Sequence, residues 1–125
     1  MKAKILVVDD SSLARRTTRQ LLEELGHEVD DAAEGEQALE HFFLRPPDLV
    51  ILDLVMNGMY GLDVLAKMRE MNPAVKVIVA TADIQQSTVE QARAGGAKGL
   101  LNKPVGREKL NTAVSVVLSG GETWN

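Results

Sequence analysis

Leu49-Val50-Ile51-Leu52-Asp53 is the stretch of sequence that decides the fold, and a loop containing Gly58 connects it to Gly61. Four consecutive large aliphatic residues predict a strand that is buried on both faces, as in the middle of a parallel sheet. The strand ends on a carboxylate, at the place where α/β folds bind their ligands. The function of the chain therefore depends on what Asp53 faces.

The composition indicates one small domain and excludes several classes of function. The 125 residues are 45% hydrophobic and 26% charged, and the net charge of -4 leaves no surplus of lysine and arginine to neutralise nucleic-acid phosphates. The absence of cysteine excludes disulfides and thiolate metal sites and favours a reducing cytoplasm. No run approaches the ~20 apolar residues of a membrane span. We expect a cytoplasmic protein that neither binds nucleic acid directly nor inserts into a membrane.

Strands and helices alternate along the chain. Apolar runs and helical periodicity predict strands at 5–8, 27–32, 49–53, 75–80 and 99–102, and helices between Ser11 or Ser12 and Gly26, at 34–43, 61–71 and 85–94, and over 110–118. Such a βα repeat predicts a parallel sheet with right-handed crossovers. The second strand is polar enough to lie at an edge, which favours the strand order 2-1-3-4-5 in an α/β fold.

Each helix is expected to pack on the sheet through an apolar stripe. The stripes are Leu13, Thr17, Leu21 and Leu25, with Leu22 beside them, in the first helix, Ala38, Leu39, Phe42 and Phe43 in the second, Val64, Leu65, Met68 and Met71 in the third, and Leu110, Ala113, Val114, Val117 and Leu118 in the last. The helix at 85–94 offers only Val89 and Ala92, so it should be the least firmly anchored. Residues 1–119 are expected to form the domain and residues 120–125 a flexible tail.

Polar side chains follow every strand except the second. They are Asp9 and Asp10, Asp53, Thr81 and Lys103. Because the carboxyl ends of parallel strands share one edge, three carboxylates should meet there and repel one another, unless one is protonated or a divalent cation lies among them. An all-oxygen pocket suits Mg²⁺. A carboxylate beside Mg²⁺, a lysine and a hydroxyl is arranged for nucleophilic attack on phosphorus.

This set of residues resembles the receiver domain of two-component response regulators. The resemblance covers about residues 4 to 118 and is carried by Asp9-Asp10, Asp53 with Met56 and Gly61 three and eight residues later, Thr81-Ala82 and Lys103-Pro104. It implies a flavodoxin-like (βα)5 three-layer sandwich. It also implies that Asp53 accepts a phosphoryl group from a sensor histidine kinase or a phosphotransfer protein.

The resemblance assigns a role to each residue of the set. Asp10 would hold Mg²⁺ directly and Asp9 mostly through water, together with Asp53 and the backbone carbonyl of Val55. The phosphoryl group would be bound by Thr81, the backbone of Ala82 and Lys103. The Lys103–Pro104 peptide bond would be cis.

Three features depart from the family's pattern. Asn57 stands where receivers usually have proline. Leu100 stands three residues before the lysine, where an aromatic switch residue is expected, which puts the family's usual rotamer switch in question. Val55 and Asp83, two residues past Asp53 and Thr81, occupy positions that modulate dephosphorylation, and this pair predicts no particular lifetime.

Other conspicuous residues are weaker candidates for function. His27 and His41 are isolated, and structural roles are expected for both. Met56, Met59 and Tyr60 either cover the end of the sheet or form an adaptable docking surface. Trp124 in the tail is expected to be disordered or to contact a partner.

The sequence therefore predicts a stand-alone receiver, monomeric or weakly dimeric, that is a phosphoacceptor and not a classical enzyme. No output domain is expected after Leu118, so output would pass through the face formed by the 85–94 helix, the 99–102 strand and the last helix. One alternative is a Mg²⁺-dependent phosphohydrolase that works through an aspartyl phosphate, although such enzymes carry a second aspartate where this chain has Val55. The other is a binding module that is not phosphorylated.

Overall fold

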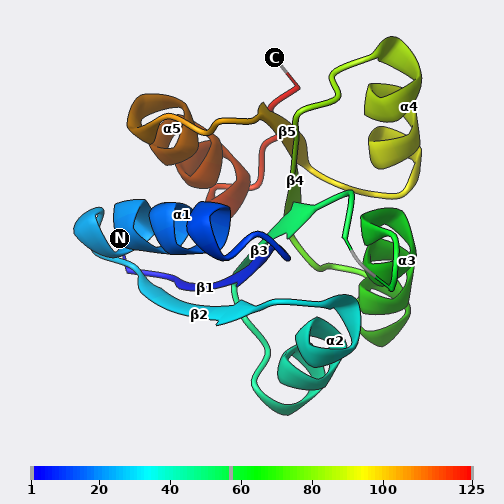
Figure 1. The fold of residues 1–125 in the computed structure, drawn as a ribbon, viewed down its shortest axis with the longest axis horizontal. Coiled ribbons are helices and arrows are strands. Elements are labelled where there is room, and N and C mark those ends of the chain that lie inside the picture. The colour runs from blue at the N-terminus through cyan, green and yellow to red at the C-terminus, as the bar shows by residue number, and fades with distance from the viewer. Residues whose placement is uncertain (1, 57, 125) are drawn as a thin grey trace.

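The computed structural model describes residues 2–56 and 58–124, in which strands and helices alternate along the chain (Figure 1). The strands are β1 Lys4–Val8, β2 Glu28–Ala32, β3 Leu49–Asp53, β4 Val77–Thr81 and β5 Gly99–Asn102. The helices are α1 Ser12–Glu24, α2 Gly35–Leu44, α3 Gly61–Met71, α4 Gln86–Ala94 and α5 Arg107–Leu118. Each predicted element is present, with ends that shift by a few residues. Asn57, one of the departures from the family's pattern, lies outside the described residues.

The five strands form one parallel sheet in the order β2-β1-β3-β4-β5, as predicted. Every residue of β3 and β4 is buried, whereas β2 at the edge buries only Val29 and Ala32. The uninterrupted apolar run of β3 therefore lies in the middle of the sheet, where both of its faces are covered.

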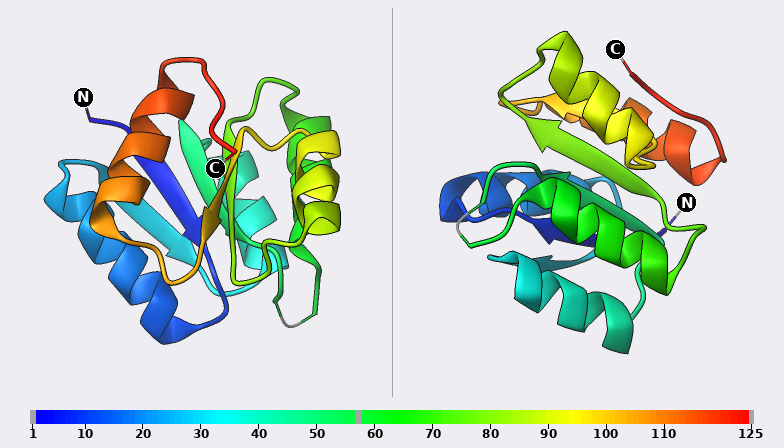
Figure 2. Two further views of the ribbon diagram at one scale, coloured as in Figure 1. Left: turned by 90° about the horizontal axis from the view of Figure 1, so that it is seen from above. Right: turned by 90° about the vertical axis from the view of Figure 1, so that its right-hand side faces the viewer.

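Helices cover both faces of the sheet (Figures 1 and 2). Alternate side chains of the strands point to opposite sides, so two apolar cores form. Leu6 and Val50 belong to the core under α2, α3 and α4, and Ile5 and Ile51 belong to the core under α1 and α5. This arrangement confirms the predicted three-layer sandwich.

The buried face of α1 includes only part of the predicted stripe. Leu13 is 71% exposed and Thr17 is also exposed, whereas Leu22 is fully buried, as predicted. Leu13 and Leu22 are nine residues apart, which places them about half a turn from each other around the helix. The prediction for Leu13 and Thr17 was wrong. Residues that are four apart do not lie directly above one another on an α-helix, so a stripe with this spacing winds around the helix axis and only one part of it faces the sheet.

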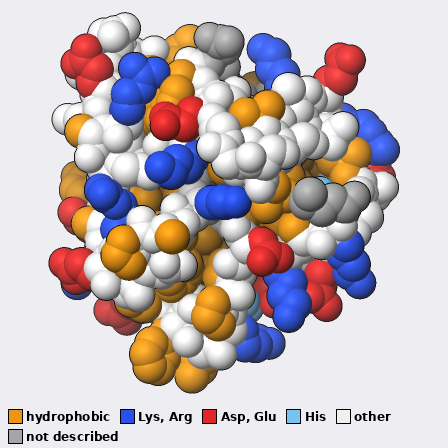
Figure 3. Space-filling model, turned by 180° about the vertical axis from the view of Figure 1, so that it is seen from behind, with side chains coloured by type: hydrophobic (Ala, Val, Ile, Leu, Met, Phe, Trp, Pro, Cys, Tyr) orange, Lys and Arg blue, Asp and Glu red, His pale blue; other side chains and the backbone are white. Residues whose placement is uncertain are grey.

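Two further stripe residues lie at the surface. Phe43 is 72% exposed, because its neighbour Phe42 takes the inward position on α2, and Met71 at the end of α3 is 44% exposed. Their assignment to the core was wrong. Figure 3 shows hydrophobic side chains gathered over α2, where Leu44 is 63% exposed. Among the described residues, no helix has both the length and the apolar character needed to cross a membrane.

The segment after α5 is paired with the sheet, in contrast to the loose tail expected from the sequence. Thr123 forms a parallel bridge with Gly99 of β5. The Leu100 amide donates to the Thr123 carbonyl at 3.0 Å, and the Thr123 amide donates to the Lys98 carbonyl at 2.9 Å. Trp124 packs against the core under α4. The edge of β5 has unpaired backbone groups that attract an extended segment, and these residues supply one.

The neighbouring residues Phe42 and Phe43 provide a test of the packing of α2. Phe42 is 3% exposed, so we expect Phe42→Ala to lower the free energy of unfolding by about 3–5 kcal/mol through the cavity that it leaves. Phe43→Ala should change the free energy of unfolding by less than about 0.5 kcal/mol. Urea denaturation of the two variants measures both values. Equal losses would contradict the orientation of α2.

Candidate functional site

The register of the sheet brings the predicted site residues to one edge. Asp53 is the last residue of β3 and lies opposite Ala80, and Thr81 is the last residue of β4 and lies opposite Asn102. Asp9 follows β1 and Lys103 follows β5. The predicted convergence of strand ends is therefore present in the structure.

A lysine lies between two buried carboxylates at this edge. The Lys103 ammonium is 2.6 Å from Asp9 Oδ2 and 3.5 Å from Asp53 Oδ1. Asp9 is 4% exposed and Asp53 is 7% exposed. Buried charges are costly unless they are paired, and this lysine neutralises part of the repulsion between the two acids.

Asp10 completes a cluster of three carboxylates. Asp9, Asp10 and Asp53 each offer an oxygen atom, and these atoms all lie within 4.8 Å of one another. Hard oxygen ligands in such a cluster are those that Mg²⁺ prefers. The donor set therefore fits a magnesium ion that is held by side chains from the ends of β1 and β3.

Asp9 is held in place by the start of α1. The Ser11 amide donates to Asp9 Oδ1 at 2.9 Å, and the Arg15 guanidinium donates to the Asp9 backbone carbonyl at 2.7 Å. Arg15 also lies 3.6 Å from the Asp31 carboxylate of β2. This role of Arg15 was not predicted from the sequence, although a basic residue in the first turn after an acidic strand end was a usable signal.

Burial controls the protonation of Asp53. Loss of hydration raises the pKa of the Asp53 carboxyl, the nearby Lys103 ammonium opposes that shift, and the Asp9 carboxylate adds to it. The Val55 amide also donates to Asp53 Oδ1, at 3.4 Å. Because burial dominates, the pKa of Asp53 lies above its ordinary value, and a cation at the site would favour its ionised form.

The loop after β3 is closed by a glycine that lies against the strand end. The Gly61 amide donates to the Leu54 carbonyl at 3.0 Å, and a Cβ atom at residue 61 would collide with the Asp53 carbonyl oxygen. Only glycine permits this approach. The glycine eight residues after Asp53 thus has a steric function beside the site.

The two methionines of the same loop cover the end of the sheet. Met56 is 7% exposed, and Met59 is packed so closely on Gly35 that its sulfur would lie 2.8 Å from a Cβ atom there. Tyr60 differs from them, because it is 70% exposed. Met56 and Met59 therefore cover the end of the sheet, which was one of the two predicted roles. Of these three residues, only Tyr60 is exposed enough for the other role, docking of a partner.

Thr81 joins the site to the start of α4. Its hydroxyl accepts a hydrogen bond from the Asp83 amide at 3.1 Å. The Asp83 carboxylate in turn accepts from the Gln85 amide at 3.0 Å and the Thr88 hydroxyl at 2.8 Å, and these bonds lower the pKa of Asp83. Asp83 therefore stabilises the first turn of α4, a role that the sequence analysis missed.

The backbone at Lys103 lies beside Thr81 and continues into a cis peptide bond. The Lys103 amide donates to the Thr81 carbonyl at 2.8 Å, which fixes the end of β5 beside the end of β4. The Lys103–Pro104 peptide bond is cis, as predicted. The roles assigned to the Val55 carbonyl and the Ala82 backbone stay predictions.

Both histidines make structural contacts away from the strand ends. The Ala3 amide donates to His27 Nδ1 at 3.1 Å, and burial lowers the pKa of His27. His41 Nε2 lies 3.0 Å from Asp30 Oδ2 on β2. Neither residue belongs to the cluster around Asp53.

Comparisons with known proteins agree on one family. The family model for the response regulator receiver domain matches residues 5–115. The chemotaxis protein CheY of Halobacterium salinarum is 32% identical over 119 residues, which are 95% of this chain and 99% of that protein. The sporulation initiation phosphotransferase F of Bacillus subtilis is 31% identical over 118 residues, which are 94% and 95% of the two chains.

A solved structure supports the same relationship. A chain in the crystal structure of the CheX–CheY–BeF3–Mg²⁺ complex of Borrelia burgdorferi superposes with a TM-score of 0.84 at 30% identity. The match covers 89% of this chain and 85% of that chain. The relatives thus share the strand order and helix placement over nearly the whole length of the chain.

The raised pKa of Asp53 predicts how stability depends on pH. The folded state binds a proton at Asp53 more tightly than the unfolded state does, so the ionised carboxylate costs stability above its folded pKa and the cost disappears toward about pH 4. Without divalent cations, we expect Asp53→Asn to be more stable than the wild type at pH 7. This difference in the free energy of unfolding should shrink as the pH falls.

Urea denaturation of both proteins in a chelating buffer, between about pH 4 and pH 8, measures that difference. Glu40→Gln changes an exposed carboxyl group on α2 and serves as the matched control, with no comparable trend. A difference between Asp53→Asn and wild type that does not vary with pH would contradict the account.

Proposed function

Since the chain belongs to the response regulator receiver domain family, we propose that Asp53 accepts a phosphoryl group from a histidine kinase or a phosphotransfer protein, in a Mg²⁺-dependent reaction. The observation that carries the proposal is the Lys103 ammonium between the carboxylates of Asp9 and Asp53, at 2.6 and 3.5 Å. This contact supports the proposal, because the proposed nucleophile, the lysine cation and a proposed metal-binding acid would lie within reach of one phosphoryl group.

Asp9, Asp10, Asp53 and the backbone carbonyl of Val55 would hold the magnesium ion, directly or through water. When bound, Mg²⁺ supplies positive charge to phosphoryl oxygens and offsets the repulsion among the carboxylates. The Ser11 amide and the Arg15 guanidinium keep Asp9 in position for this role, because they bind its side chain and its backbone.

Asp53 is the nucleophile. One of its carboxylate oxygens attacks phosphorus, a P–O bond forms, and the P–N bond to the donor histidine breaks, so the electron pair of that bond returns to the imidazole. Lys103 stabilises the charge on the phosphoryl oxygens. The Thr81 hydroxyl accepts from the Asp83 amide, so its own hydrogen can be donated to a phosphoryl oxygen, beside the Ala82 backbone.

The surface around the site suits a protein donor. Leu13, Val55 and Ile84 follow the ends of β1, β3 and β4, and they are 71%, 67% and 55% exposed. Exposed apolar side chains at the end of the sheet that carries Asp53 provide a docking surface for a protein, which a small phosphate donor does not need. These side chains therefore favour transfer from a protein.

Output is proposed to pass through protein contacts at the face of α4, β5 and α5. In α4 only Ala92 is fully buried, and the loop that leads to this helix begins at Thr81. A phosphoryl group on Asp53 would draw the Thr81 hydroxyl toward itself and shift that loop. Residues 1–119 would signal as a monomer or a weak dimer.

Phosphorylation is tested by incubating the chain with acetyl phosphate and Mg²⁺ and measuring its intact mass. We expect one labile phosphoryl adduct on the wild type and none on Asp53→Asn or in the absence of Mg²⁺. Asp63→Asn, which changes an exposed acid on α3, should retain the adduct and is the matched control. Rapid turnover of acetyl phosphate without an adduct would favour a phosphohydrolase. A chain that neither forms the adduct nor binds Mg²⁺ would be an inactive binding module.

The output face is tested by hydrogen exchange with and without acetyl phosphate and Mg²⁺. We expect amide protection to change within residues 85–101, because Asp83 anchors α4 and its amide binds the hydroxyl that would move. Protection in α2 should stay constant and serves as the internal control. Phosphorylation without any change within 85–101 would exclude this route of output.

A further inference from the structure

The outer edge of β5 is occupied by the chain's own C-terminal segment, residues 121–124. Thr123 makes two backbone hydrogen bonds there, to Leu100 at 3.0 Å and to Lys98 at 2.9 Å. The segment runs parallel to β5 and lies beside α4 (Figure 2). It is placed as a sixth strand would be, although it pairs through a single bridge.

Two glycines make this placement possible. Gly120 has a φ of +96°, which allows the chain to turn back after α5. Gly99 has no side chain, and a Cβ atom there would lie 2.6 Å from the Thr123 carbonyl oxygen. The edge of β5 is thus shaped to accept a peptide backbone at Gly99.

An aromatic side chain holds the end of the segment. The Arg93 guanidinium of α4 lies 4.6 Å from the centre of the Trp124 ring, and the ring packs on the core under α4. The Trp124 indole N–H donates to Glu122 within the segment at 2.8 Å. The guanidinium and the ring attract each other through a cation–π interaction.

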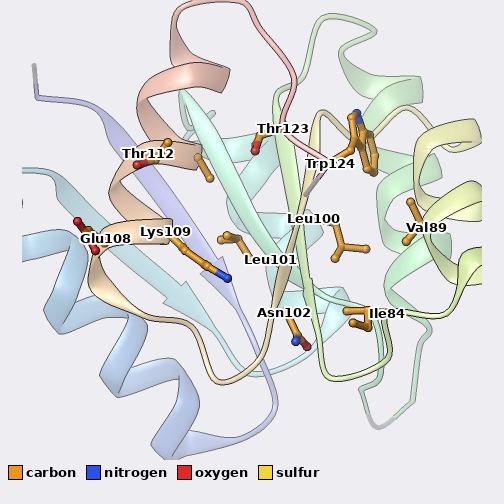
Figure 4. A pocket seen from close by; sticks show the side chains of 11 residues that line it. Ile84, Val89, Leu100, Leu101, Asn102, Glu108, Lys109, Thr112, Thr123 and Trp124 are labelled. Atoms are coloured by element: carbon orange, nitrogen blue, oxygen red, sulfur yellow. The ribbon is translucent and has the colours of Figure 1, made fainter.

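The segment fills only part of the surface that it lies on. A cavity of about 600 Å³ remains beside Trp124, and Figure 4 shows its lining side chains from α4, β5 and α5 and from the loop before α4. Ile84, Val89 and Leu100 form the apolar wall, and Glu108 and Lys109 form the charged wall. Thr123 and Trp124 of the segment themselves line this cavity.

We propose that the outer edge of β5, together with α4, is a groove for an extended peptide segment that carries an aromatic residue, and that residues 121–124 are its internal occupant. A partner would add a strand in place of Thr123, through the same backbone groups of Lys98 and Leu100, and would place its aromatic ring under Arg93. Main-chain bonds then supply affinity and the ring supplies specificity. The proposal does not depend on phosphorylation of Asp53.

The contacts of the segment suit an exchangeable occupant. They are three backbone bonds, to Val116, Lys98 and Leu100, and one half-buried ring, and they must offset the entropy of ordering the segment. The short connection from α5 raises the effective concentration of the segment to the millimolar range, and this tethering favours the internal occupant over a free peptide. A partner with further contacts in the cavity would displace it.

The proposal is tested with a synthetic peptide of residues 119–125 and the isotope-labelled full chain. In the variant Thr123→Pro/Trp124→Ala, the internal occupant loses the amide that bonds to Lys98 and the ring that lies under Arg93. We expect the peptide to shift the amide signals of Arg93 and residues 99–101 saturably in this variant. In the wild type, at least a tenfold higher peptide concentration should be needed for the same shift.

Controls separate the groove from unspecific effects. The same peptide with alanine in place of tryptophan should bind at least tenfold more weakly, and Phe43→Ala, which removes an exposed ring elsewhere, should respond as the wild type does. Trp124→Ala alone provides a second variant if the double variant is unfolded. Equal responses in variant and wild type, shifts confined to other residues, or no shift in either variant would overturn the proposal.

Discussion

The contact on which this structure depends is the one between the Lys103 ammonium and the two carboxylates of Asp9 and Asp53. Each acid is more than nine-tenths buried, and a buried carboxylate is costly unless a cation or a hydrogen-bond donor lies close by. Lys103 supplies that charge from the end of β5, two strands away from Asp53, because the parallel register aligns the carboxyl ends of all strands. The parallel register of the sheet therefore also determines where the reactive side chains lie.

The residues around these three side chains mainly fix the positions of the strand ends. Gly61 lets the loop approach Asp53, Arg15 fixes the backbone at Asp9, and the Lys103 amide fixes the end of β5 to Thr81. All these contacts involve the backbone, so the positions of the reactive groups are set by main chain that is itself anchored in the sheet. Such anchoring keeps a reacting group in place, as the proposed phosphoryl transfer would require.

The sequence was sufficient for the strands, their order and the set of residues at the sheet edge, because β3 is apolar at every position before Asp53 and the other strand ends carry complementary groups. It was insufficient for the helix faces. Periodicity does not say which part of a broad stripe meets the sheet, and so Leu13 and Phe43 were placed in the core. It also missed the pairing of Thr123, since a single bridge depends on the free edge of β5 and on Gly99, which no local pattern reveals.

The loop between β4 and α4 connects the site around Asp53 with the groove that residues 121–124 occupy. Thr81 at its start faces the phosphoryl site of the proposed function, and Ile84, three residues later, lines the cavity beside Trp124. Position 100 lacks the aromatic residue that the family's pattern predicts, yet an aromatic ring lies on the same surface because residues 121–124 carry one there. Any coupling between the two places would, by thermodynamic linkage, act equally in both directions. An occupant of the β5 edge that moved Ile84 and Thr81 together would change the movement of Thr81 toward a phosphoryl group, and a phosphoryl group on Asp53 would change the affinity of that occupant by the same factor.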